Sequence, residues 1–400
     1  MERTVCDIAI VGGGLAGGLA ALAIARARPG LTVRLIEAGE EVGGNHRWSW
    51  FASDLRPAGA ALMDGLAQMR WEEGHAVSFP GCARDLPTPY RSLASRDFAV
   101  ALRRALPHGT MLTGRAAVAL AADGVALADG ERIAARVVID ARGFAPTAHL
   151  TGGWQVFMGR TLRCELPHGL TRPTIMDATV EQIGGYRFVY VLPLGPRIVF
   201  IEDTYYRDAP LLDRSALERR LDDYAQVHGW RGEVMDEETG VLPVITGGDL
   251  AAFQAQHRIP GVAVIGARGG FVHPLTSYTL PFAVETALAI AGALPDRLAG
   301  PSSPGAELAA LVEARARRHW RAMRFYRLLG AMLFGAAAPA ERWRIFARFY
   351  TLPSALIERF YAGRSTLADR ARVLCGRPPV PIGRALRALA TPSAALKDTA

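Results

Sequence analysis

A glycine-rich turn between a short apolar strand and a helix constrains this chain more than any other feature of its sequence. Residues 7–11 form a β-branched apolar run, and residues 15–28 have helical spacing and composition. The turn between them has glycine at Gly12, Gly14 and Gly17. The first glycine allows a tight turn, the second lets the backbone approach a pyrophosphate, and the third lets helix and strand pack closely. The helix N-terminus would then face the phosphates.

An acidic residue extends this pattern. Residues 32–36 predict a second strand, and Glu37 follows at its end, 20 residues after Gly17. A carboxylate at this place accepts hydrogen bonds from a ribose and disfavours a 2′-phosphate. A glycine-rich turn without a ligand is the alternative, but strand, helix, second strand and acid in register favour a dinucleotide site. The residues expected to contact the dinucleotide are Gly12, Gly13, Gly14, Leu15, Ala16, Gly17 and Glu37.

The strands and helices predicted in the rest of the chain are typical of an α/β protein. A hairpin is predicted around Asp129-Gly130, because Asp-Gly favours tight turns between strands. Further strands are predicted at residues 136–140, 185–191, 197–201 and 262–266, and helices at 215–228, 281–293 and, with interruptions, 306–372. Residues 295–305 are the best linker candidate, and the proline-rich run at 378–381 opens a loose end.

Composition excludes several classes of protein. The 400 residues (43.0 kDa) are half apolar and 21% charged, so whole-chain disorder is excluded and two to three domains are expected. Four cysteines without CxxC spacing predict no metal site and no disulfide scaffold, which fits a reducing cytosol. The apolar stretch at residues 8–25 imitates a signal peptide, but Asp7 and five interrupting glycines argue against one. No transmembrane helix is expected, because no apolar run reaches about 18 residues.

Charge is divided unevenly along the chain. The net charge is +8, yet residues 315–400 alone carry 16 arginines and Lys397 against four acidic residues, a net +13. Residues 1–314 therefore carry −5. A slightly acidic body with a basic C-terminal region argues against a uniformly basic nucleic-acid binder.

Further segments resemble the flavoproteins with two dinucleotide-binding domains. Glu37 is followed six residues later by Gly43-Gly44, and residues 137–143 and the late strand that ends at Gly266 match the same superfamily. This resemblance implies FAD as the dinucleotide and brings the late strand back to the flavin. It adds Gly44, Arg47 and Gly266 to the expected cofactor contacts, with His46 as a plausible flavin neighbour.

Three segments narrow the resemblance to the bacterial lycopene β-cyclases of the carotenoid pathway. They are Gly-Asn-His-Arg-Trp-Ser-Trp at 44–50, Phe-Ile-Glu-Asp-Thr at 200–204 and His-Pro-Leu-Thr-Ser-Tyr-Thr-Leu-Pro at 273–281. The last two are far more specific than the glycine pattern, and the match spans most of the chain. Two conservative departures are Asp203, where the family often has glutamate, and Thr279, where it often has serine.

The acidic pair in the second segment is the candidate catalytic centre. Glu202 ends an apolar strand, and a carboxyl group that enters an apolar cleft has a raised pKa and stays protonated near neutrality. From the residues alone, an ordinary surface acid is the more frequent outcome. The resemblance reverses this weighting and implies that Glu202 protonates a carbon of the polyene. Asp203 points to the opposite strand face if the strand continues, as a structural partner or towards solvent, and ranks second.

The resemblance also implies a reaction and its cofactors. The expected activity is a cyclisation without net redox change, which converts the ψ end groups of lycopene to β-ionone rings through γ-carotene to β-carotene. The flavin would act in its reduced form, with NAD(P)H as the reductant. A redox flavoenzyme of the same fold, such as an aromatic hydroxylase or isoprenoid reductase, is the alternative. A non-enzymatic FAD- or lipid-binding protein is a third reading, disfavoured by the acidic motif.

Several other side chains have two interpretations each. His273 is a base or flavin contact, or else a loop histidine that caps or packs. Arg47 is a flavin neighbour or a solvent-facing residue. Aromatic side chains support carbocations through their π faces, but in strands they more often belong to the core. Only Tyr278, which lies inside the specific third segment, is favoured as a residue that lines the substrate channel. The aromatic candidates considered are Trp48, Trp50, Tyr186, Tyr190 and Tyr278.

Arginine and aromatic residues alternate on predicted helices between residues 315 and 350. This pattern suits an anionic membrane surface, where lycopene is dissolved. A helical bundle that packs its aromatic stripe on the core is the competing interpretation, and no nucleic-acid motif is present. We therefore expect a cytoplasmic protein, peripheral on the inner face of the cell membrane, with linear carotenoids as ligands and other carotenoid enzymes as candidate partners.

These features together predict an α/β fold with a Rossmann-like FAD-binding domain, an inserted, mostly antiparallel β substrate domain and a C-terminal helical region. The expected FAD-binding domain is discontinuous and comprises residues 1–80, 110–150 and 255–295. The substrate domain comprises 81–109 and 151–254. Residues 300–375 form the membrane-associating helices, and 376–400 a loose tail.

Overall fold

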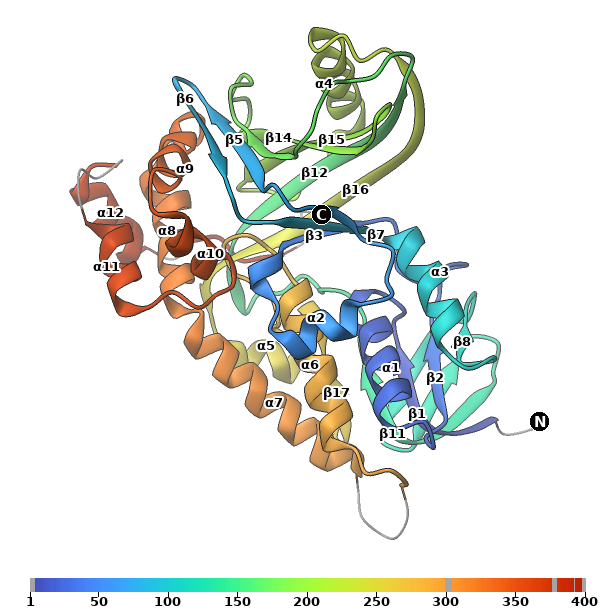
Figure 1. Ribbon diagram of the computed structural model, residues 1–400. Coiled ribbons are helices and arrows are strands. Elements are labelled where there is room, and N and C mark those ends of the chain that lie inside the picture. Colours follow the sequence, from blue (N-terminus) through green and yellow to red (C-terminus); the bar gives the residue numbers. More distant parts are fainter. Residues whose placement is uncertain (1–3, 299–303, 376–379, 392, 398–400) are drawn as a thin grey trace.

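A computed structural model describes residues 4–298, 304–375, 380–391 and 393–397 (Figure 1). Its first sheet has the strand order β8-β2-β1-β11-β10-β9, with β17 also paired to β11. The pairs β1–β2, β1–β11, β2–β8 and β11–β17 are parallel, whereas β9, β10 and β11 pair antiparallel. The strands are β1 (Thr4–Val11), β2 (Val33–Ile36), β8 (Met111–Leu112), β9 (Ala117–Ala121), β10 (Gly124–Leu127), β11 (Arg132–Asp140) and β17 (Val262–Val264).

Helix α1 (Leu15–Ala27) connects β1 to β2 and packs against α6 (Leu280–Ala293), a helix from far along the chain. Helix α3 (Ser95–Ala105) also packs on α1: a Cβ at Gly18 would lie 2.7 Å from the Phe98 ring. The strand–helix–strand unit and the return of β17 and α6 confirm the predicted mixed α/β, Rossmann-like class. Helix α5 (Leu250–His257) and the 3-10 turn η2 (Gly266–Gly269) precede and follow β17.

The second sheet has seven strands in the order β16-β12-β15-β14-β13-β5-β6, and all its pairs are antiparallel except β13–β5. Helix α4 (Arg214–Val227) covers its outer face against β12 and β15 (Figure 1). This sheet is the mostly antiparallel part that the sequence predicts. Its strands are β5 (His75–Phe79), β6 (Cys82–Leu86), β12 (Leu150–Cys164), β13 (Thr174–Asp177), β14 (Tyr186–Gly195), β15 (Ile198–Arg207) and β16 (Gly232–Gly248).

A small third sheet lies between the two large ones in Figure 1. Its order is β3-β7-β4, and both pairs are antiparallel. The turn η1 (Ala52–Asp54) and helix α2 (Pro57–Met63) follow β3. The strands are β3 (Arg47–Phe51), β4 (Met69–Trp71) and β7 (Tyr90–Ala94).

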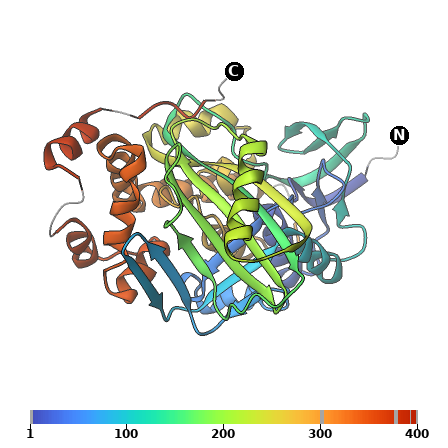
Figure 2. The ribbon, with the colours of Figure 1, turned by 90° about the horizontal axis from the view of Figure 1, so that it is seen from above.

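The C-terminal third is helical and lies along one side of the two large sheets (Figure 2). Helix α7 packs against β17 and β11, and α8 packs against β16 and α12. The helices are α7 (Pro304–Ala322), α8 (Arg324–Ala336), η3 (Pro339–Glu341), α9 (Trp343–Phe349), α10 (Ser354–Tyr361), α11 (Leu367–Leu374) and α12 (Ile382–Ala390).

The sheets do not follow every expected boundary. Strand β5, expected in the FAD-binding part, pairs with β13 of the second sheet, whereas α3, expected in the substrate part, packs on α1. The prediction of a loose tail is wrong for its described part: residues 382–390 form α12, and Leu396 is fully buried because the chain pairs back onto β12 through a Thr151–Ala395 bridge. Residues 299–303 of the predicted linker, and the first two residues of the proline-rich run at 378–381, lie outside the described residues.

Candidate active site

The predicted phosphate turn forms between β1 and α1. Gly12 has φ +103°, and a Cβ there would lie 2.7 Å from the Ala141 carbonyl oxygen, so only glycine fits. A Cβ at Gly17 would lie 1.9 Å from the Gly12 oxygen, which is the close helix–strand contact that the pattern predicts. At Gly14, by contrast, a Cβ would meet nothing within 4 Å. The N-terminus of α1, with no side-chain cap, therefore opens onto free space large enough for a phosphate group.

Glu37 at the end of β2 holds this turn together. Its carboxylate accepts hydrogen bonds from the Gly13 N–H at 2.7 Å and from the Gly39 N–H at 2.8 Å. Each carboxylate oxygen has a second lone pair, so ribose hydroxyl groups still find acceptors here. The residue is thus both a structural clamp and a fitting ribose ligand.

A cavity of about 440 Å³ extends from this turn along the carboxyl ends of β1, β2 and β11. Seven of the predicted cofactor contacts line it, namely Gly12, Gly14, Leu15, Ala16, Glu37, Gly44 and Gly266. Gly13 and Gly17 stand behind the turn rather than in the lining, and Arg47 lines a neighbouring cavity instead. The open N-terminus, the glycine cradle and the acid fit the adenosine diphosphate part of a dinucleotide.

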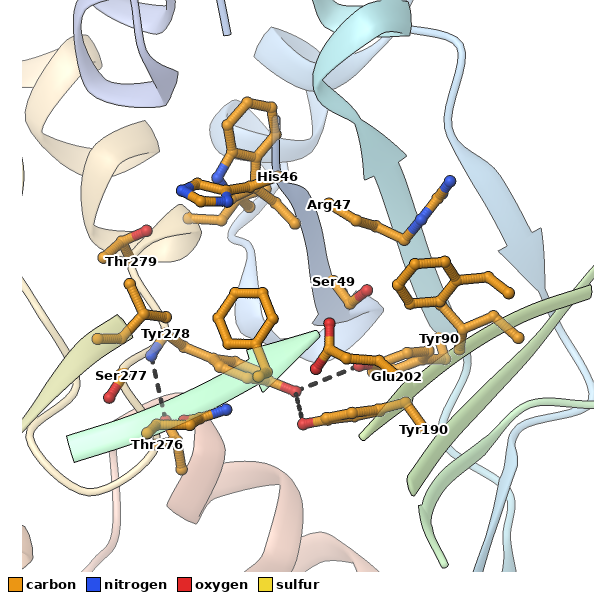
Figure 3. A pocket seen from close by; sticks show the side chains of 17 residues that line it. His46, Arg47, Ser49, Tyr90, Tyr190, Glu202, Thr276, Ser277, Tyr278 and Thr279 are labelled. Atoms are coloured by element: carbon orange, nitrogen blue, oxygen red, sulfur yellow. Dashed lines mark hydrogen bonds between the residues drawn. The ribbon is translucent and has the colours of Figure 1, made fainter. Parts of the chain in front are cut away.

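The neighbouring cavity measures about 170 Å³ and is the candidate substrate site (Figure 3). It shares the lining residues His46, Trp48 and Thr279 with the dinucleotide cavity, so the two cavities are adjacent. Its walls come from the second and third sheets and from the segment that leads into α6. The other residues that line it are Arg47, Ser49, Tyr90, Gln155, Phe157, Tyr190, Leu192, Phe200, Glu202, Leu242, Thr276, Ser277, Tyr278 and Leu280.

Glu202 is the carboxyl group of this cavity. It is 9% exposed and accepts a hydrogen bond from the Thr204 hydroxyl at 2.7 Å. Burial raises the pKa of Glu202 from 4.5 to about 7, against the opposing effects of hydrogen bonds with Thr204 and Glu238 and of the Arg47 charge. A large fraction of the molecules therefore carries a protonated Glu202 at neutral pH, poised to donate to a group in the cavity.

Asp203 points away from the cavity, as strand alternation predicts, because β15 continues to Arg207. It is fully buried and accepts hydrogen bonds from Arg187 Nε at 2.9 Å and from the Tyr205 hydroxyl at 2.7 Å. Of the two alternatives for this residue, the structure therefore places it as a structural partner, outside the cavity lining.

His273 lies outside the cavity lining as well. It is fully buried, its ring lies 4.7 Å from the Tyr326 ring, and its Nδ1 accepts the Thr276 N–H at 3.3 Å. Burial lowers the pKa of His273 to about 3, so the ring is neutral. Its contacts fix the turn that presents residues 276–280 to the cavity, and Ser277 in this turn has φ 59°, rare for a residue with a side chain.

The aromatic wall is organised around Tyr278. Its hydroxyl lies 3.2 Å from that of Tyr90 and 3.4 Å from that of Tyr190 (Figure 3). Of the aromatic candidates, Trp48, Tyr190 and Tyr278 line the cavity, whereas Trp50 and Tyr186 are core residues. Tyr90 was missed by sequence reasoning, because only the pairing of β7 with β3 brings it here.

A third cavity, about 260 Å³ and almost entirely apolar, lies among α8 to α12. It shares the lining residue Thr276 with the candidate substrate cavity, so the two cavities lie on either side of this residue's segment. At its far side, α12 exposes three apolar side chains at helical spacing, Ile382, Leu386 and Leu389. The aromatic side chains of α8 to α10 instead point largely inward, including Phe325, Tyr326, Phe346, Tyr350, Phe360 and Tyr361.

Comparison with known proteins identifies the family. A family model described as lycopene cyclase protein matches residues 7–387. The lycopene beta-cyclase of Pseudescherichia vulneris is 45% identical over 96% of both chains, and that of Pantoea ananas 42% identical over 96% of this chain and 98% of its own.

Solved structures with the same fold are more distant. PqsL, a probable FAD-dependent monooxygenase from Pseudomonas aeruginosa, has a TM-score of 0.58 at 18% identity, covering 87% of this chain and all of PqsL. A geranylgeranyl bacteriochlorophyll reductase-like protein from Thermoplasma acidophilum has a TM-score of 0.56 at 14% identity, covering 97% and 96%. The family match over nearly the whole chain, on a fold shared with flavoenzymes, shows that this chain belongs to the lycopene cyclase family.

Proposed function

We propose that this protein cyclises the ψ end groups of lycopene to β-ionone rings, giving γ-carotene and then β-carotene. The observation that carries the proposal is Glu202, a buried carboxyl group with a raised pKa in an aromatic cavity adjacent to the dinucleotide cavity. The names of the family relatives support the same activity. A polyene offers no heteroatom, so the acid has to protonate carbon, and this requires a positioned and protonated donor.

The steps balance without any change of oxidation state. Glu202 transfers its proton to the terminal double bond and leaves a tertiary cation. The next double bond along the chain attacks this cation, which closes a six-membered ring and moves the positive charge into it. Loss of a ring proton to a base then gives the β-ionone ring. Tyr190 and Tyr278 line this cavity, and an aromatic ring that presents its π face to the cation would stabilise it by roughly 0.5–2 kcal/mol.

The dinucleotide cavity would hold FAD through the α1 N-terminus, the glycine turn and Glu37. When bound and reduced, with NAD(P)H as reductant, this electron-rich group supplies electrostatic stabilisation of positive charge beside the substrate cavity. His46, Trp48 and Thr279 line both cavities and would set the boundary between cofactor and substrate.

The substrate cavity is far too small for a whole C40 polyene, so most of the molecule needs another apolar space. The third cavity is a candidate, because it shares Thr276 with the substrate cavity and its lining extends to α11 and α12. We propose that the α11–α12 side of this cavity contacts the lipid surface. The exposed apolar residues of α12 alternate there with Arg384 and Arg387, which suits an anionic membrane.

This surface differs from the one predicted from residues 315–350. Many aromatic side chains of that region are packed in the core, as the competing bundle interpretation holds, and the exposed apolar residues lie further along the chain. None of the helices in the described part of the chain combines the length and apolar character needed to cross a bilayer.

Expression in a bacterium that accumulates lycopene tests the proposed activity. The expected result is conversion of the red pigment to β-carotene, with wild-type protein active and Glu202→Gln inactive but still loaded with flavin. Products isomeric with lycopene, without stoichiometric loss of NAD(P)H, distinguish the cyclase from a redox flavoenzyme. Unchanged lycopene in cells that contain folded, flavin-loaded protein would refute the assignment.

A further inference from the structure

Glu202 has a second carboxyl group beside it, which the sequence reasoning missed. Gly159 on the central strand β12 pairs with Glu202 of β15 on one side and with Glu238 of β16 on the other. Residues in register on adjacent strands point to the same face of the sheet, so the two glutamates face each other across Gly159. Their Cα atoms are two strand spacings apart, about 10 Å, which two glutamate side chains bridge.

Gly159 leaves the space that this approach requires. A Cβ at this position would lie 2.4 Å from the Phe200 ring and 3.0 Å from Cγ of Glu238. Any side chain here would therefore push apart the groups that fill the gap. Each carboxyl group influences the pKa of the other, and a hydrogen bond between two facing acidic side chains requires at least one proton on the pair.

The environment of Glu202 and Glu238 favours a state in which the two carboxyl groups together hold one proton. Burial raises the pKa of both carboxyl groups, that of Glu238 well above its usual range, and their mutual repulsion adds to the effect on Glu238. Arg47 opposes this shift: its charge lowers both pKa values, and its backbone N–H donates to Glu238. Thr204 donates to Glu202, and Asp203 on the opposite face raises the Glu202 pKa.

The two glutamates differ in their access to the substrate and to solvent. Glu202 lines the candidate substrate cavity, whereas Glu238 is not part of that lining. Glu238 is half-buried and continues from the solvent-exposed end of β16, residues 232–236. Its Oε1 is buried without a hydrogen-bond partner among the described residues, so this oxygen is free to accept a proton. Glu238 therefore stands behind Glu202, away from the substrate.

We propose that Glu238 is a positioning residue that holds the proton of Glu202 and restores it from the solvent side after each ring closure. This inference rests on the proposed function, because each cyclisation leaves Glu202 as a carboxylate while an apolar substrate fills the cavity. In the restoring step the Glu238 carboxylate first takes a proton from water; this O–H bond then breaks as the proton moves to the Glu202 carboxylate, and Glu238 is a carboxylate again. The ring proton that the base removed returns to solvent, so no net proton is consumed. No redox partner is needed.

Glu238→Gln in the flavin-loaded enzyme tests this role, with Glu233→Gln as the matched control because Glu233 is an exposed acid on the same strand. With enzyme in excess over lycopene in detergent micelles, the first ring should close at close to the wild-type rate, since Glu202 starts protonated. The steady-state rate should fall by at least about tenfold, because its reprotonation now lacks a donor. Glu238→Asp should restore part of the steady-state rate. The wild-type rate should fall above pH 7, and in Glu238→Gln the pH at which the rate falls should be different.

Infrared spectroscopy of the carboxyl carbonyl stretch gives a readout that does not depend on catalysis. The protein should show a band of a protonated, hydrogen-bonded carboxyl group at pH 7 that shifts in both Glu202→Gln and Glu238→Gln and stays in Glu233→Gln. A Glu238→Gln enzyme with the steady-state rate and pH profile of the wild type, or an unshifted band, would overturn the inference. If wild-type protein shows the shared band but does not cyclise lycopene, the proposed function fails and the carboxyl pair stands.

Discussion

Replacing Glu202 by glutamine should make the protein more stable while removing its activity. The structure holds this carboxyl group in a place that disfavours its charge, with a pKa raised from 4.5 to about 7. At about 1.36 kcal/mol for each pKa unit, ionising Glu202 at high pH costs the folded state roughly 3 kcal/mol relative to the unfolded chain. Glutamine has nearly the same shape, keeps an oxygen to accept the Thr204 hydroxyl, and never ionises.

The sign of the pH dependence follows from the raised pKa. Below the unfolded value of 4.5, Glu202 is protonated in both states and costs nothing. Between pH 4.5 and 7 the unfolded state releases the proton first, so the wild-type protein loses stability as pH rises through this window. Above pH 7 the full difference between variant and wild type should be present. Because Glu238 shares the proton, we expect a measured gain for Glu202→Gln of about 1–3 kcal/mol at pH 8.

Denaturant unfolding of both proteins at pH 5 and pH 8 measures this difference. The free energies of unfolding should differ by less than about 1 kcal/mol at pH 5 and diverge further at pH 8, with Glu202→Gln the more stable. Glu233→Gln serves as the control, since an exposed acid should give the same small difference at both pH values. A Glu202→Gln difference that does not change with pH would refute the view of Glu202 as a buried acid poised near neutrality.

Three further outcomes are expected. Gly14→Val should leave folding intact, because nothing lies within 4 Å of its Cβ position. The valine side chain should fill the phosphate site and abolish flavin retention, measured by the flavin absorbance of the purified protein. Full flavin content in this variant would contradict the assignment of the glycine turn as the phosphate site. Arg187→Met should destabilise the protein by about 3–5 kcal/mol in denaturant unfolding, because the buried Asp203 loses its ion-pair partner and keeps the Tyr205 hydroxyl as a hydrogen-bond donor. A change below about 1 kcal/mol would argue against a structural role for this ion pair. Serine at the three exposed apolar positions of α12, Ile382, Leu386 and Leu389, should weaken co-sedimentation with anionic vesicles several-fold. Serine at the exposed Leu166, outside α12, is the control and should leave co-sedimentation unchanged. Equal binding of all variants would show that this surface is not the lipid contact.

Much of the fold was predictable because its signals are local. The β1–α1–β2 unit, the hairpin near Gly130 and the helices α4 and α6 lie within a few residues of their predicted bounds. The opposite faces of Glu202 and Asp203 also follow from strand alternation alone. The small β3-β7-β4 sheet and the placement of β5 were not predicted, since which strands pair depends on partners distant in the sequence.

The basic C-terminal region shows where local pattern is insufficient. Arginine and aromatic residues on helices indicate a surface, a core or both, and periodicity does not state which face meets the body of the protein. The structure packs many of the aromatic residues against the second sheet, as in the 4.3 Å stacking of Phe346 on Tyr186. It leaves the apolar stripe of α12 exposed, in a tail that the sequence predicted to be loose.

The sequence by itself determined the dinucleotide turn and the acid that clamps it, because each depends on residue types at short and fixed spacing. Glu202 became the candidate proton donor through the family resemblance of its segment, since the residues alone left an ordinary surface acid as the more frequent outcome. Only the tertiary structure decided what surrounds that donor. The strand order β16-β12-β15 sets Glu238 opposite Glu202 across a glycine, and the pairing of β7 with β3 brings Tyr90 to Tyr278. A carboxyl group acquires its pKa from burial and neighbours, and these come from parts of the chain that no local pattern connects.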